Sequence, residues 1–117
     1  MDGSHAANGP YDGRVELVTT GDGRRIVLAG EIDMRCRDAM NAVLLQLEEQ
    51  GPVDTVELAD VAFLSSDGLA FLAQVHRVAA AADRVVTLHS PQRTTLRALA
   101  LSGLLELFIV QPTPVVR

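Results

Sequence analysis

The chain has 117 residues, of which 48% are hydrophobic and 21% charged, so it fits one globular domain that buries its own core. Its formal net charge of -5 argues against nucleic acid or an anionic membrane as partner, because those surfaces select patches of Lys and Arg. Cys36 is the single cysteine and no apolar run could span a bilayer, so we expect a cytoplasmic protein with a protein partner.

The two ends of the chain differ in composition from its middle. Residues 1–13 carry Gly, Pro, Asn and Asp without an apolar period, which predicts a flexible N-terminal tail. Pro112 and Pro114 forbid much regular structure after the last apolar run, so residues 112–117 are predicted to form a C-terminal tail. One domain over residues 14–111 remains between the tails.

The domain begins with a predicted β-hairpin. Apolar and polar residues alternate from Val15 to Thr20, as in a half-buried strand, and residues 21–23 (GDG) have the composition of a tight turn. The unbroken apolar run from Ile26 to Ala29 predicts a second strand that is covered on both faces. Gly30 is predicted to end that strand, and Gly30 to Asp33 to form a loop.

Helices and strands are predicted to alternate over the rest of the domain. Apolar spacing and terminal residues predict helices over 35–50, from about 66 to 82, and from Ser90-Pro91 to Gly103, with strands over 53–58, 85–88 and 107–110. The order ββαβαβαβ implies an α/β domain with a mixed, mostly parallel sheet of about five strands. Functional residues of such sheets lie at the carboxyl ends of the strands. Three loops are expected there: Gly30 to Asp33, Asp60 to Ser66, and His89 to Pro91.

The main candidate site is Ser65-Ser66-Asp67-Gly68, which begins at the end of the middle loop, at the turn from a strand to a helix. Free backbone N–H groups and the helix dipole favour a phosphate there, and a phosphate on Ser66 beside Asp67 and Asp33 would change the charge of a binding surface. The same residues fit a simpler interpretation, in which Ser65 or Ser66 caps the helix and Asp67 complements its dipole. Gly68 fits either close helix packing or the approach of a partner.

An enzyme is less well supported. The run Leu64 to Gly68 approaches the G-x-S-x-G elbow of hydrolases, but Leu64 replaces the first glycine, a Gly-rich oxyanion motif is missing, and His89 would have to be the base. His5, His76, His89 and Cys36 are too scattered for metal ligands, and the nucleotide-binding loops are missing too. We therefore predict a binding module without metal or cofactor.

Three segments, in order, resemble the signature of STAS domains, the family of bacterial anti-sigma factor antagonists. Residues 56–69 (VELADVAFLSSDGL) resemble the central pattern D-L-S-x-V-x-F-[IL]-D-S-[ST]-G-L, and residues 30–33 (GEID) resemble G-E-[LI]-D after the second strand. Residues 99–109 resemble the closing pattern L-x-x-x-G-L-x-x-x-F-x-I. The resemblance spans Val15 to Val110 and implies the STAS fold.

The resemblance also implies a function. Ser66 aligns with the serine that is phosphorylated in the family, and Asp33 and its turn would face the partner together with Ser65, Asp67 and Gly68. The implied partner is an anti-sigma factor with a histidine-kinase-like ATPase fold, which binds the unmodified protein, releases a sigma factor and phosphorylates the serine. A serine phosphatase would restore the unmodified state.

The chain departs from the family pattern at the candidate site itself. The acidic residue that usually precedes the serine is Ser65 here, and Asp67 stands at the following hydroxyl position. Ser65 is therefore the second choice for phosphorylation. Because some STAS proteins serve transporters or stressosome-like assemblies, the alternative prediction is a scaffold or transporter-associated subunit in which Ser66 only caps the helix.

Overall fold

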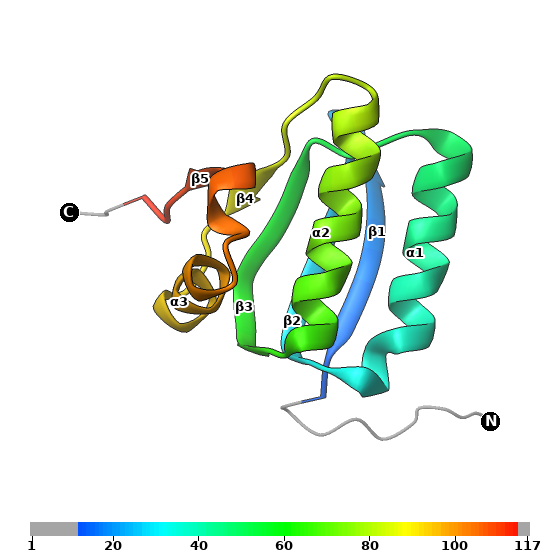
Figure 1. Cartoon of the computed structure of the whole chain (residues 1–117). Helices are drawn as coiled ribbons and strands as arrows, with labels where there is room; N and C mark the ends of the chain where they lie inside the picture. Colours follow the sequence, from blue (N-terminus) through cyan, green and yellow to red (C-terminus); the bar gives the residue numbers. More distant parts are fainter. Residues whose placement is uncertain (1–11, 115–117) are drawn as a thin grey trace.

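The structure, a computed structural model, describes residues 12–114, so most of the two predicted tails lies outside the described residues. Within that range the chain forms one five-stranded sheet and three α-helices (Figure 1). Strand β1 is antiparallel to β2, and the other neighbours are parallel. The elements are β1 (Arg14–Thr20), β2 (Gly23–Ile32), η2 (Met34–Cys36), α1 (Arg37–Gln50), β3 (Thr55–Leu64), α2 (Ser66–Ala81), β4 (Thr87–His89), α3 (Arg93–Leu101), η3 (Leu105–Leu107) and β5 (Ile109–Gln111).

This architecture confirms the predicted α/β class and element order. The strand order in the sheet is β1-β2-β3-β4-β5, which is the order of the strands along the chain. Helices α1 and α2 lie side by side over one face of the sheet (Figure 1). The inward residues of both helices and of the central strands are buried together, among them Met40, Val43 and Leu47 of α1 and Phe71, Leu72 and Val75 of α2. No helix within residues 12–114 has the length and apolarity needed to cross a membrane.

Strand β2 is longer than predicted, because Gly30 lies inside it rather than at its end. Gly30 has a φ of 76°, in the left-handed region that favours glycine, and the register against β3 shifts between Gly30 and Glu31. The glycine thus accommodates an irregularity in the strand, and pairing with β3 continues to Ile32. The predicted loop from Gly30 to Asp33 is reduced to the residues that follow Ile32.

Strand β3 is also longer than predicted. The segment from Asp60 to Leu64, expected to be a loop, is the second half of β3 and pairs with residues 29–32 of β2. Val61 and Leu64 are buried under the helices, while Phe63 is exposed. Polar Asp60 at the start of this segment made it resemble a loop, but Asp60 is an exposed residue in the middle of β3.

The predicted start of the third helix at Ser90 was wrong, because α3 begins at Arg93 with Gln92 as N-cap. Ser90 is buried with a φ of 56°, and its N–H donates to the Gln111 carbonyl at 2.7 Å. The Ser90 N–H therefore links the end of β4 to β5, and Ser90 is not the N-cap of α3. Gly103 ends α3 as predicted, with a φ of 79° directly after the C-cap.

Candidate functional site

Two of the three loops that were predicted to carry functional residues meet at one end of the sheet. The Ser65 N–H donates to the Ile32 carbonyl at 2.9 Å, which joins the residues that leave β2 and β3. Asp33 follows Ile32, and Ser66 follows Ser65 as the first residue of α2. Because β2 and β3 are parallel neighbours, Asp33 and the Ser65–Gly68 turn leave the same end of the sheet.

The third predicted loop lies elsewhere. His89 ends β4 opposite Glu57, and its Nδ1 lies 2.7 Å from the Glu57 Oε1. Glu57 precedes Leu64 by seven positions on β3, so at about 3.3 Å per residue His89 lies roughly 20 Å along the sheet from the end of β3. The pairing of Ser66 with His89 that a hydrolase would need is therefore not formed.

The two adjacent serines have different structural roles. Ser65 is the N-cap of α2: its Oγ accepts hydrogen bonds from the N–H groups of Asp67 at 3.1 Å and Gly68 at 3.4 Å. Ser66 is exposed, and its hydroxyl makes no hydrogen bond to any residue that the structure describes. The capping interpretation thus applies to Ser65, and the Ser66 hydroxyl remains accessible.

Gly68 has a packing role. It is buried in the first turn of α2, against the strands. A Cβ added there would lie 2.5 Å from the Leu64 Cδ1 and 3.1 Å from the Ile32 Cγ2. Of the two interpretations of Gly68, close packing of the helix on β2 and β3 is the one that the geometry supports.

Asp33 is engaged within its own loop. Its Oδ1 accepts the Arg35 N–H at 3.0 Å as the N-cap of η2, and the Arg35 guanidinium donates to both of its carboxylate oxygens at 2.9 to 3.3 Å. These bonds lower the pKa of the Asp33 carboxyl, the side-chain hydrogen bond from Arg35 being the largest cause. The same guanidinium reaches Glu31 at 3.1 Å and Asp12 at 3.2 Å.

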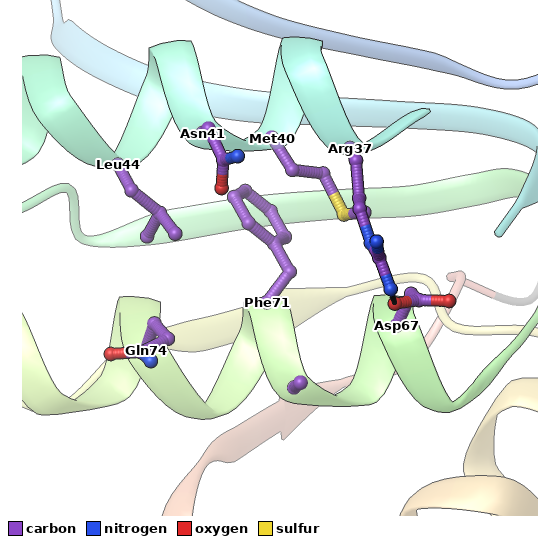
Figure 2. Close-up of a pocket in the computed structure, with 8 residues that line it drawn as sticks. Arg37, Met40, Asn41, Leu44, Asp67, Phe71 and Gln74 are labelled. Atoms are coloured by element: carbon purple, nitrogen blue, oxygen red, sulfur yellow. Dashed lines mark hydrogen bonds and ion pairs between the residues drawn. The ribbon is translucent and has the colours of Figure 1, made fainter. Parts of the chain in front are cut away.

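Asp67 contacts a second arginine. The Nε and Nη2 of Arg37, the first residue of α1, donate to its Oδ1 at 3.3 Å and 3.2 Å. This ion pair links the N-terminal ends of α1 and α2 (Figure 2). Its side chains are 62% exposed for Arg37 and 29% exposed for Asp67.

Arg35 and Arg37 were missed by the sequence reasoning, although one signal was available. Both residues stand at the start of a helical segment, where the positive end of the helix dipole disfavours basic side chains. An arginine placed against the dipole is explained by a contact outside its own helix. The partners of Arg35 are Asp12 before β1, Glu31 at the end of β2 and Asp33, the N-cap of η2. The partner of Arg37 is on α2.

A groove of about 260 Å³ runs between α1 and α2 beside the ion pair. Figure 2 shows Phe71 reaching from α2 toward α1, with Asn41 and Met40 above it and the Arg37–Asp67 pair at one end. The groove is lined by Arg37, Met40, Asn41, Leu44, Asp67, Ala70, Phe71 and Gln74. Its lining is mixed in polarity, and the buried side chains of Met40 and Phe71 contribute little exposed apolar surface.

The remaining nucleophilic and metal-ligating residues stay apart. Among residues 12–114 no group of three His, Cys, Asp or Glu side chains could hold a metal ion. The Cys36 thiol is buried, with its sulfur 3.6 Å from the Glu31 carbonyl oxygen. The ring of His76 packs edge-on against Phe108, with 5.8 Å between the two ring centroids. His5 lies outside the described residues.

Comparison with known proteins places these features in context. A family model described as "Mlab, STAS domain" matches residues 15–111. An anti-sigma factor antagonist from Mycobacterium paratuberculosis has a similar structure, with a TM-score of 0.74 and 24% identity over 92% of each chain.

Two structures of SpoIIAA are also similar. The unphosphorylated anti-sigma factor antagonist SpoIIAA has a TM-score of 0.68 and 19% identity over 84% of this chain and 88% of that chain. The phosphorylated SpoIIAA, described as a Bacillus cell fate determinant, has a TM-score of 0.62 and 23% identity over 84% and 91%. These likenesses establish a shared fold, and the search of curated proteins found no significant match.

Proposed function

The chain belongs to the STAS domain family, and from this premise we propose that it is an anti-sigma factor antagonist controlled by phosphorylation of Ser66. The observation that carries the proposal is the division of roles between Ser65 and Ser66. Ser65 supplies the cap of α2, so the exposed Ser66 hydroxyl is available to a kinase without loss of the cap. The names of similar structures, which include SpoIIAA in both phosphorylation states, agree with this assignment.

The partner proposed here is an anti-sigma factor with a histidine-kinase-like ATPase fold. In the modification, the Ser66 Oγ attacks the γ-phosphorus of ATP and its proton passes to a base of the kinase. The bond between the γ-phosphorus and the bridging oxygen breaks, and ADP leaves. A serine phosphatase reverses the change by transferring the phosphoryl group to water, which returns the Ser66 hydroxyl.

The surface around Ser66 is suited to a protein partner. Met34, next to Asp33, is 64% exposed, and Phe63, two residues before Ser65, is 53% exposed. Large apolar side chains that stay exposed beside a polar centre are typical anchors of protein interfaces. A phosphate on Ser66 would place close to two negative charges at this surface, which weakens binding to a partner that fits the unmodified form.

A STAS subunit of a scaffold or transporter, without a phosphorylation switch, is the alternative. The observation in its favour is that Ser65 replaces the acidic residue of the family pattern directly before Ser66. Genes beside this one would help to separate the two proposals. A neighbouring gene for an ATPase-type anti-sigma factor favours the switch, and neighbouring transporter genes favour the alternative.

The proposal is tested by incubating the protein with candidate anti-sigma kinases and ATP, followed by mass spectrometry. We expect one phosphate on the wild type and on Ser65→Ala, and none on Ser66→Ala. Phosphate that persists unchanged in Ser66→Ala would move the site to another residue. If none of the kinases encoded with the protein modifies the wild type, the alternative without a switch is favoured.

A further inference from the structure

We propose that Arg37 is the internal ligand of a phosphate on Ser66, and that phosphorylation transfers this arginine from Asp67 to the phosphate. The inference rests on the proposed modification of Ser66 and adds how the fold responds to it. In the unmodified protein Arg37 holds Asp67 across the end of the α1–α2 groove (Figure 2). Because Asp67 follows Ser66 directly, a phosphate on Ser66 competes for the same guanidinium.

The choice of Arg37 over Arg35 follows from their partners. The Arg35 guanidinium is surrounded by the carboxylates of Asp12, Glu31 and Asp33, and removing it would leave these charges together. Among residues 12–114, Arg37 forms an ion pair with Asp67 alone, and its side chain is 62% exposed. Moving Arg37 therefore breaks one exposed ion pair, the kind of contact that contributes little to stability.

The geometry of the existing pair leaves Arg37 room to bind more strongly. Its Nε and Nη2 both donate to one oxygen, the Oδ1 of Asp67, at 3.3 Å and 3.2 Å. Its Nη1 makes no hydrogen bond to any residue between 12 and 114. A phosphate offers several oxygens and nearly twice the charge of a carboxylate, so it suits the fork of donors on a guanidinium better than this single-oxygen contact does.

The transfer would give the switch two effects at once. The unmodified surface carries the paired charges of Arg37 and Asp67, which largely cancel. After modification the phosphate and Asp67 repel each other, Arg37 can neutralise only part of their charge, and the site gains about two negative charges. The link between α1 and α2 at this end of the groove is replaced by a link from α1 to the phosphate. Asp67 is then free to turn toward a partner and repel it.

The test uses protein with phosphoserine installed at position 66 during synthesis, so it needs neither the kinase nor the anti-sigma factor. The pKa of the phosphoserine, ordinarily about 6, is measured by titration of its ³¹P NMR signal. A nearby arginine stabilises the dianion and lowers this pKa, so Arg37→Gln should raise it by about half a unit relative to the wild type. Arg37→Lys keeps the positive charge but lacks the planar set of guanidinium donors, so it should give an intermediate pKa of the phosphoserine.

The matched control is Arg77→Gln, which removes an exposed arginine of α2 whose guanidinium hydrogen-bonds only to Gln74 among described residues. It should leave the pKa of the phosphoserine unchanged. The Arg37 Nε–H resonance should shift between the unmodified and phosphorylated wild type. An equal phosphoserine pKa in the wild type, Arg37→Gln and Arg77→Gln would overturn the inference. That result would leave the proposed function standing, because kinase modification and partner binding are measured separately.

Discussion

The turn Ser65–Gly68 has two sides that differ in how they are held. On the inner side, Ser65 caps α2 with two hydrogen bonds and Gly68 lies against Leu64 and Ile32 with no space for a side chain. On the outer side, Ser66 is exposed without a hydrogen-bond partner among described residues, and Asp67 makes one ion pair to Arg37. The inner side is fixed by packing, whereas the outer side can change its contacts at small cost.

This difference explains how one short turn can serve both stability and regulation. A site that is modified and bound by partners must be accessible, and a helix start must satisfy its first N–H groups. Dividing the tasks between adjacent residues allows a change at Ser66 without unfolding the start of α2. Substitutions on the inner side should therefore reduce stability, and substitutions on the outer side should change charge and binding.

The largest effect on stability is expected for Gly68→Val. The added Cβ would lie 2.5 Å from the Leu64 Cδ1, so β3 and α2 must move apart or Leu64 must change its rotamer. Overpacking of this kind typically costs about 2–3 kcal/mol, which a urea unfolding experiment measures as a lower free energy of unfolding. Gly21→Val is the control, because a Cβ at Gly21 meets nothing within 4 Å. An equal loss in both variants would contradict the packing role of Gly68.

A smaller effect is expected from removing the cap of α2. Ser65→Ala deletes the oxygen that accepts the N–H groups of Asp67 and Gly68, and loss of such a cap costs about 1 kcal/mol. Ser66→Ala, the same substitution one position later, should change the free energy of unfolding by less than about 0.5 kcal/mol. If the two variants lost the same stability, the division of roles between the serines would be wrong.

The smallest effect concerns the exposed loop beside the turn and depends on pH. Arg35 lowers the pKa of Asp33, so this carboxylate stabilises the folded state above its ordinary value of 3.8 and loses that contribution as the pH falls through the lowered value. Asp33→Asn should therefore be less stable than the wild type near neutral pH, with a difference that fades in acid. Urea unfolding at several pH values measures it.

The control for this prediction is Asp22→Asn in the β1–β2 turn, a position without an ion pair among the described residues. Asp22→Asn removes a carboxylate without breaking a contact to an arginine, so near neutral pH it should lower the free energy of unfolding less than Asp33→Asn does. A difference between wild type and Asp33→Asn that is constant from neutral pH into acid would show that the contact with Arg35 does not stabilise the fold.

The parts of the fold that follow local rules were predictable from sequence. The apolar stripes of α1 and α2, the end of α1 at Gln50 and the helix stop at Gly103 follow from spacing and backbone preference, and the structure confirms them. The prediction failed at the ends of β2 and β3. There Gly30 and Asp60 indicated loops, but pairing between the two strands outweighed the preferences of single residues.

The candidate site was predictable as a location but not as an arrangement. A serine pair at a strand-to-helix turn predicted capping or phosphate binding, and which serine caps depends on side-chain geometry that the sequence leaves open. Arg37 and Asp67 lie 30 positions apart in the chain, and only the packing of α1 beside α2 brings them together. A basic residue at the start of α1 indicates a partner outside that helix, but the local sequence does not identify which residue the partner is.

The most direct test of the account compares the affinity of the anti-sigma factor for unmodified protein, protein with phosphoserine at position 66, and Ser66→Ala. Because the added phosphate places repulsive charge at the outer side of the turn, we expect at least a tenfold, or about 1.4 kcal/mol, weaker binding for the phosphorylated form. Ser66→Ala should bind about as tightly as the unmodified wild type. Equal affinity of all three forms would contradict the claim that Ser66 is the switch.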